Sequence, residues 1–154
     1  MKSLSFIPTK LFMNEAIRLA KEAYSRNEVP VGAVVVYDDV IIGTGRNRRE
    51  QTNLPMAHAE IEAIYAASKF LKTWKLPECE LYVTLEPCPM CMGAILNSRI
   101  KRVIFGLEDF RTGCCGSALD MKPMDYYRSP DMFPGFMEEE CKKIMKDFFT
   151  SLRG

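Results

Sequence analysis

Residues 80–105, ELYVTLEPCPMCMGAILNSRIKRVIF, contain the pattern that decides the fold. The first six residues, ELYVTL, alternate in polarity and are rich in residues that favour strands. A helical segment that begins with a proline follows over 89–98, and KRVIF at 101–105 predicts a second strand. Strands joined through a helix are expected to run parallel, because such a connection crosses over the sheet.

The rest of the chain extends this alternation of strands and helices. Residues 29–45, VPVGAVVVYDDVIIGTG, predict an antiparallel hairpin with strands at 32–37 and 40–45 and a tight turn at Asp38–Asp39. The apolar run Val34–Val36 indicates a strand that is buried on both faces. Helices are predicted over 9–26, 57–70 and a C-terminal stretch marked by Met137, Cys141, Ile144, Met145, Phe148 and Leu152. The chain is therefore expected to be α/β, with helices on both faces of a mixed sheet and a site at the carboxyl ends of strands.

The composition is that of one ordinary globular domain over residues 1–154, with 47% hydrophobic and 27% charged residues. The formal net charge of +1 gives no overall field that attracts nucleic acid, so any basic surface must be local. No stretch approaches the roughly 20 apolar residues of a membrane span, and the N-terminus has no signal-peptide pattern. We expect a cytoplasmic protein whose six cysteines stay as thiols or bind metal.

Cys88 and Cys91 have the spacing of metal ligands. Pro89 is suited to the first position of a helix, which makes Cys88 the residue before the helix and places Cys91 in its first turn. Residues three apart lie on one helical face, so both sulfurs can approach one point. The positive end of the helix dipole favours thiolates there. The pair is expected to bind a soft cation.

His58 is the single histidine of the chain and supplies the missing ligand. Cys114 and Cys115 are adjacent, a spacing that rarely directs two sulfurs at one ion. A site of His58, Cys88 and Cys91 with one open position is the arrangement of catalytic zinc, which yields hydroxide at neutral pH. Glu60 then becomes a candidate to carry protons from the attacking water to a leaving amine. The simpler alternatives are a structural histidine and an acidic residue in the first turn of a helix.

The pattern His-x-Glu followed by Pro-Cys-x-x-Cys is the signature of zinc deaminases. The chain closely resembles the bacterial tRNA-specific adenosine deaminases of the cytidine deaminase superfamily. The resemblance runs through VPVGAVVV, GTGRN, AHAEIEAI, LYVTLEPCPMCMGAILNSRIKRVIFG, EDFRTGCCGS and EEEC…DFF. It implies a three-layer α/β/α sandwich with a central mixed sheet of about five strands, a homodimer with one zinc ion per subunit, no organic cofactor, and conversion of adenosine to inosine at the wobble position of a tRNA anticodon.

The same resemblance implies several substrate contacts. Asn47 matches the family's base-contacting asparagine, and Asp109 matches the residue that meets the nucleotide's sugar. Val31, the backbone N–H of Ala59 and the carbonyl of Pro87 would shape the pocket around a flipped-out base. The alternatives are a turn residue for Asn47, a core residue for Val31 and a helix-entry residue for Pro87.

Two departures bear on the RNA partner. The segment 125–136, DYYRSPDMFPGF, has no counterpart of the Asn-His-Arg found in bacterial relatives, and the chain ends at FFTSLRG without a basic tail. Deamination of a free base or nucleoside, such as guanine or cytosine, therefore stays an alternative, with a non-catalytic zinc module as a more remote one.

Two groups of basic residues and a pair of aromatic residues are candidates for contact with RNA. The basic groups, Arg46, Arg48 and Arg49 and then Arg99, Lys101 and Arg102, flank the predicted pocket in sequence. They are candidates for contact with phosphate, although such residues are often only solvated. Of the consecutive Phe148 and Phe149, one is expected to pack in the core, which leaves the other able to stack on a base.

Overall fold

The sheet is five-stranded and mixed, with the strand order β2-β1-β3-β4-β5. A computed structural model describes residues 5–122 and 127–154. Its strands are β1 (Gly32–Tyr37), β2 (Val40–Arg46), β3 (Cys79–Leu85), β4 (Arg102–Leu107) and β5 (Asp131–Phe133). Its helices are α1 (Lys10–Ser25), α2 (Arg49–Thr52), α3 (Ala59–Leu71), α4 (Pro89–Ser98) and α5 (Glu138–Arg153).

The pairing of the strands confirms the predicted directions. β1 is antiparallel to both β2 and β3, whereas β3–β4 and β4–β5 are parallel. Asp38 and Asp39 both have positive φ, 49° and 60°, which is the backbone of a type I′ turn and matches the twist of a hairpin. Parallel β3 and β4 therefore end at the same edge of the sheet, where the loops that follow them meet.

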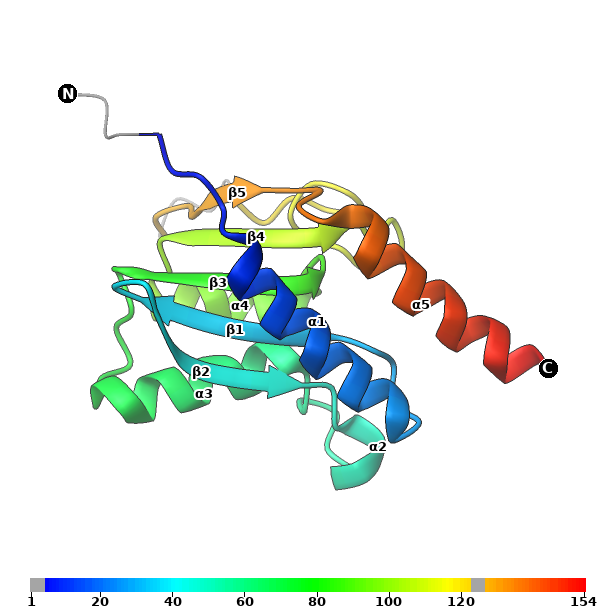
Figure 1. The fold of residues 1–154 in the computed structure, drawn as a ribbon. Helices are drawn as coiled ribbons and strands as arrows, with labels where there is room; N and C mark the ends of the chain where they lie inside the picture. Colours follow the sequence, from blue (N-terminus) through cyan, green and yellow to red (C-terminus); the bar gives the residue numbers. More distant parts are fainter. Residues whose placement is uncertain (1–4, 123–126) are drawn as a thin grey trace.

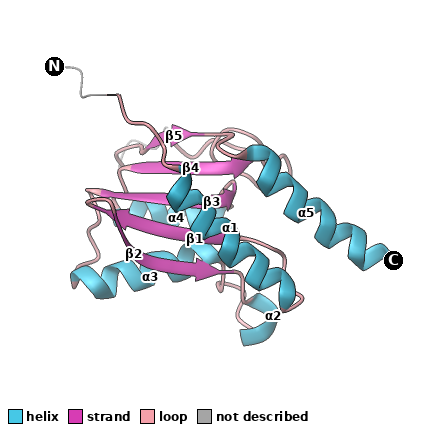
Figure 2. Ribbon diagram, in the orientation of Figure 1, coloured by secondary structure: helices cyan, strands magenta, loops and turns pink. Residues whose placement is uncertain are grey.

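Helices cover both faces of the sheet, which confirms the three-layer arrangement (Figure 1 and Figure 2). The core on one face joins α3 and α4 to Ala33, Val35 and Val83. The core on the other face joins α1 and α5 to Val34, Val36 and Tyr82. Alternate residues of β1 thus enter opposite cores, which is why its run of valines is continuous. Within the described residues, no helix is long and apolar enough to cross a membrane.

A close contact between β2 and α3 fixes the start of α3. A Cβ atom added at Gly45 would lie 2.1 Å from the carbonyl oxygen of Ala59, a distance that no side chain tolerates. The absence of a side chain at Gly45 lets the first turn of α3 rest directly on the strand.

The sequence pattern does not predict two short elements of the structure. These are α2, in the polar loop before the site, and β5 at 131–133. β5 falls within the altered segment 125–136, of which 125 and 126 lie outside the described residues.

Candidate active site

Two helix N-termini converge at the predicted ligands. Cys88 is the N-cap of α4 in an extended conformation, with Pro89 in the first turn. His58 is the N-cap of α3, also extended. The short connection from β3 to α4 brings Cys88 to the carboxyl edge of the sheet, and Cys91 follows it on the buried side of the first turn.

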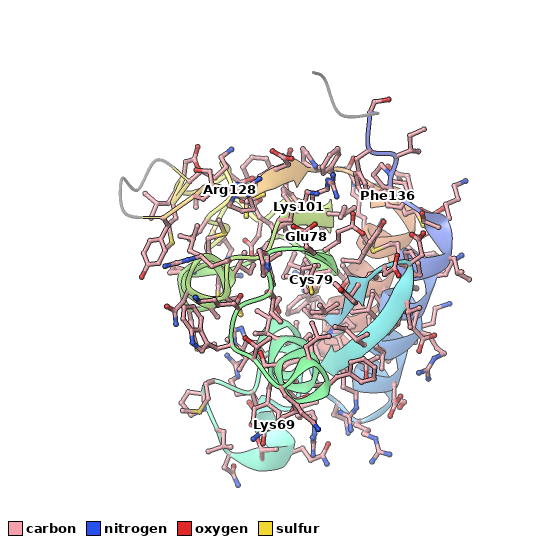
Figure 3. All side chains as sticks on the ribbon, turned by 90° about the vertical axis from the view of Figure 1, so that its left-hand side faces the viewer. Lys69, Glu78, Cys79, Lys101, Arg128 and Phe136 are labelled. Atoms are coloured by element: carbon pink, nitrogen blue, oxygen red, sulfur yellow. The ribbon has the colours of Figure 1, made fainter. Side chains whose placement is uncertain are left out.

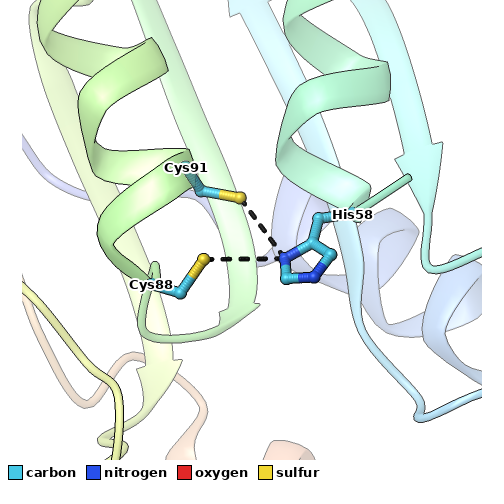
Figure 4. A group of neighbouring side chains, drawn as sticks. All are labelled: His58, Cys88 and Cys91. Carbon is cyan, nitrogen blue, oxygen red and sulfur yellow. Dashed lines mark hydrogen bonds between the residues drawn. The ribbon is translucent and has the colours of Figure 1, made fainter. Parts of the chain in front are cut away.

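The three ligand atoms form a compact group, shown in Figure 4. Nδ1 of His58 lies 3.6 Å from the Sγ atoms of both Cys88 and Cys91, and the three atoms lie within 4.8 Å of one another. Tetrahedral zinc with Zn–S of ~2.3 Å and Zn–N of ~2.0–2.1 Å requires a sulfur–nitrogen separation of about 3.6 Å. The donor set and its spacing therefore fit a zinc ion with one further coordination position.

Hydrogen bonds among His58, Cys88 and Cys91 shift the pKa values of all three side chains. Hydrogen bonds from the Cys91 thiol and from His58 lower the pKa of Cys88 to about 4. The hydrogen bond to Cys88 also raises the pKa of His58. The pKa of Cys91 is raised, because its thiol donates to Cys88 and is buried. Since ligands bind a metal as thiolate and neutral imidazole, metal binding here would release protons.

Glu60 lies in the first turn of α3, two residues after His58, and its side chain is 4% exposed. Burial raises the pKa of its carboxyl to about 7. A carboxyl group with a pKa near neutrality both accepts and donates protons, as general acid–base chemistry requires. Glu60 lines the same cavity as His58 and Cys88, so it borders the ligand group.

These groups open into a cavity of about 640 Å³, a volume typical of sites for small ligands. The cavity is lined by Val29, Val31, Asn47, Arg49, His58, Ala59, Glu60, Leu85, Glu86, Cys88, Pro89, Leu107, Glu108, Asp109, Phe110, Arg111, Thr112, Met145 and Phe149. Segments from six parts of the chain thus meet over the ligand group.

Four of the five predicted substrate contacts line this cavity: Val31, Asn47, Ala59 and Asp109. Pro87 is not among the lining residues, and its carbonyl accepts a hydrogen bond of 2.9 Å from the N–H of Cys114. The roles assigned to all five residues stay predictions.

Asn47 and Asp109 are each held by hydrogen bonds to neighbouring groups. The Nδ2 atom of Asn47 donates to the carbonyl of Val29 over 3.2 Å, and its Oδ1 accepts the N–H of Arg49 over 3.0 Å. The Asp109 carboxylate accepts the N–H of Arg111 over 3.0 Å and the hydroxyl of Thr112 over 2.9 Å. Both side chains are thereby oriented at the wall of the cavity.

The three arginines of the first predicted basic group make different contacts. Arg46 pairs with Glu22 over 3.5 Å and Arg48 with Glu62 over 3.2 Å. Arg49 instead lines the cavity.

The second basic group, Arg99, Lys101 and Arg102, lies at the other end of α4, about 15 Å along its axis from Cys88. Lys101 pairs with Glu78 over 3.7 Å, and Arg102 with Glu80 over 2.8 Å. Figure 3 shows Lys101 and Glu78 close to Cys79, where β3 begins. This group does not border the cavity, although it flanks the site in sequence.

Glu86, Phe110 and Arg111 also line the cavity and were not singled out from the sequence. Phe110 and Arg111 follow Asp109 directly. Their position in the loop after β4, at the carboxyl edge of the sheet, could have indicated that they line the cavity. Glu86 lies between a strand and a ligand, and no sequence pattern distinguishes it from a solvated acidic residue.

Several known proteins with similar sequences and structures are deaminases. The model of the MafB19-like deaminase family matches residues 8–153. The tRNA-specific adenosine deaminase of Bacillus subtilis strain 168 is 43% identical over 145 residues, which span 94% of this chain and 90% of that protein.

Two solved structures resemble this one. The first comes from studies of A-to-I editing by tRNA:A34 deaminases at the wobble position of transfer RNA. It has a TM-score of 0.84 at 39% identity, with 88% of this chain and 99% of the other covered. The second is the guanine deaminase of Bacillus subtilis, with a TM-score of 0.62 at 41% identity over 66% of each chain.

A mixed sheet between helices, with a His–Cys–Cys group and a buried glutamate at its carboxyl edge, defines the class of hydrolytic deaminases. The chain belongs to the MafB19-like deaminase family. The predicted resemblance to bacterial tRNA-specific adenosine deaminases is confirmed.

Proposed function

We propose that this protein hydrolyses adenosine to inosine at the wobble position of a tRNA anticodon. The observation that carries the proposal is the placement of His58, Glu60 and Cys88 in the lining of one cavity, with Cys91 grouped beside His58 and Cys88. The Bacillus subtilis tRNA-specific adenosine deaminase, 43% identical over nearly the whole chain, supports the choice of substrate. The proposal includes a single deaminase domain over 1–154 and a cytoplasmic location, where its RNA substrate is found.

The chemistry would be divided between the ligand group and Glu60. His58, Cys88 and Cys91 would hold one zinc ion, which when bound lowers the pKa of water to about 7 and supplies hydroxide. Glu60 takes the proton of the attacking water and delivers a proton to the departing amine. The buried position of Glu60 keeps its carboxyl beside the reacting atoms and away from solvent.

The walls of the cavity would hold the flipped-out base. An amide nitrogen carries two N–H donors, so Asn47 can hold Val29 and a base at once. Val31 and the Ala59 backbone would contact the ring, and Asp109 the sugar. Arg49 and Arg111 line the same cavity and give the local positive charge that a nearly neutral chain needs to bind phosphate.

A homodimer is part of the proposal. Four large apolar side chains of the α3–α4 layer and the loop after α3 are exposed: Tyr65, Phe70, Trp74 and Met90. Their burial against a second copy would remove this surface from water. Light scattering that gives the mass of one chain would contradict the dimer.

A direct assay separates the proposed substrate from the alternative. Purified protein is incubated with an anticodon stem-loop RNA that carries adenosine at the wobble position, and in parallel with free adenosine, guanine and cytosine. We expect inosine in the RNA and no release of ammonia from the free compounds. Ammonia from guanine without inosine in the RNA would favour the alternative, which the likeness to the Bacillus subtilis guanine deaminase supports.

Phe149 provides a test of the RNA contact. Phe148 is buried, whereas Phe149 is 40% exposed and lines the cavity. Because stacking of a base on an aromatic ring contributes ~1–3 kcal/mol, Phe149→Ala is expected to raise KM for the stem-loop roughly 5- to 150-fold. Leu152→Ala, an exposed position of the same helix outside the cavity, is the control and should leave KM unchanged. Equal KM values for the two variants would refute the contact.

A further inference from the structure

Glu86 is a buried carboxylate that is not part of the ligand group. It is 2% exposed and lies between the end of β3 and Cys88. Its own N–H donates to the carbonyl of Leu107 over 2.9 Å, so its backbone is fixed to the end of β4. Its side chain points into the segment 108–117, which follows β4.

The carboxylate accepts four hydrogen bonds from that segment. Oε1 accepts the N–H of Asp109 over 3.0 Å and also the hydroxyl of Ser117. Oε2 accepts the N–H of Cys115 over 2.9 Å and the N–H of Ser117 over 3.2 Å. One side chain therefore holds both the beginning and the end of the segment.

The segment rests directly on this carboxylate. A Cβ atom added at Gly113 would lie 2.4 Å from Cδ of Glu86 and 2.4 Å from the carbonyl oxygen of Asp109. Between the two held ends, residues 109–112 form one wall of the cavity. Contacts with Glu86 thus hold the two ends of the segment that carries this wall, while the Asp109 carboxylate organises the turn between them.

We propose that Glu86 is a positioning residue, which holds residues 109–112 at the distance from the ligand group that substrate binding needs. The proposal rests on the proposed function for the identity of the substrate. A carboxylate suits the task because it is acceptor-only, and all four of its partners are donors. Since Glu86 contributes through the wall and not through the reacting atoms, its loss should alter KM far more than kcat.

Glutamine at this position tests the role sharply. An NH₂ group in place of Oε2 would face the backbone N–H groups of Cys115 and Ser117, which can only donate and cannot reorient to accept a hydrogen bond. An NH₂ group in place of Oε1 would face the Ser117 hydroxyl, which can rotate to accept, and would leave the N–H of Asp109 as the only unmatched donor. The second orientation leaves one donor without an acceptor instead of two and is therefore favoured. Glu86→Gln should then release the beginning of the segment, at Asp109, which lines the cavity.

The experiment measures amide hydrogen exchange and kinetics on the zinc-loaded protein. For Glu86→Gln we expect faster exchange at Asp109, KM for the anticodon stem-loop raised about tenfold, kcat within about threefold, and the zinc content of the wild type. Glu28→Gln is the matched control for exchange, because Glu28 is an equally buried carboxylate that accepts backbone N–H groups from Glu50 and Gln51 of α2, which do not line the cavity. Its substitution should leave exchange at Asp109 unchanged.

Several results would overturn the role of Glu86: unchanged exchange at Asp109, unchanged KM, or a tenfold fall in kcat with KM intact. If Glu86→Gln does not fold, Ser117→Ala removes one donor to the same carboxylate and should raise KM severalfold at constant kcat. A wild-type protein inactive on the RNA would contradict the proposed function alone. The exchange rates would then still decide whether Glu86 holds the wall.

Discussion

Replacement of Glu60 by glutamine is expected to lower kcat by about 10²–10⁴, the usual contribution of a general acid–base group. Glutamine has nearly the size of glutamate but cannot carry a proton between water and the departing amine. Burial raises the pKa of this carboxyl to about 7, which suits a group that must be both base and acid in one cycle. Steady-state kinetics of inosine formation at saturating concentrations of the stem-loop give kcat directly, and the zinc content should stay at the wild-type value.

Glu62→Gln is the matched control for this experiment. Glu62 lies in the same first turn of α3, but it pairs with Arg48 over 3.2 Å and does not line the cavity. A partly exposed pair of this kind contributes little, so this variant should retain its activity. If Glu60→Gln kept wild-type kcat, or if both variants lost activity equally, Glu60 would not be the proton carrier and a non-catalytic zinc module would regain support.

The close approach of Cys88 and Cys91 could be predicted because its geometry is set locally. Pro89 is the first residue of α4, directly after the N-cap Cys88. Because residues three apart lie on one side of a helix, Cys91 is on the same side of α4 as Cys88. The likewise local turn at Asp38–Asp39 is also where it was predicted. The position of His58 could be inferred without knowledge of the fold, because the chain has no second histidine.

Features that depend on distant segments could not be predicted in the same way. Glu86 meets its hydrogen-bond partners only when the segment after β4 folds back over the end of β3, 23 or more residues later in the chain. The basic residues after α4 are near the site in sequence but lie at the opposite end of the helix, because a helix of 10 residues carries the chain away from its start. β5 has only three residues, too few for a pattern of alternation to be recognised.

Loss of one thiolate ligand is expected to remove both the metal and the activity. Cys91 is fully buried, its Sγ lies 3.6 Å from Nδ1 of His58, and the other described cysteines, Cys79, Cys114, Cys115 and Cys141, are not part of the ligand group. In Cys91→Ala only His58 and Cys88 remain, and two protein ligands are fewer than zinc sites use. Because changes of residues that merely support ligands already cost about 10–100-fold, we expect kcat/KM to fall by more than about a hundredfold.

Cys79→Ala makes the comparison decisive. Cys79 is equally buried but starts β3, at the end of that strand away from Cys88. Each variant deletes one sulfur atom from the interior, so a loss of packing would affect both, whereas loss of a ligand affects only Cys91→Ala. Elemental analysis after dialysis should find about one zinc per chain in the wild type and in Cys79→Ala, and far less in Cys91→Ala. Zinc retained in Cys91→Ala with full activity would show that Cys91 is not a ligand, because the metal would then be held by a different set of side chains.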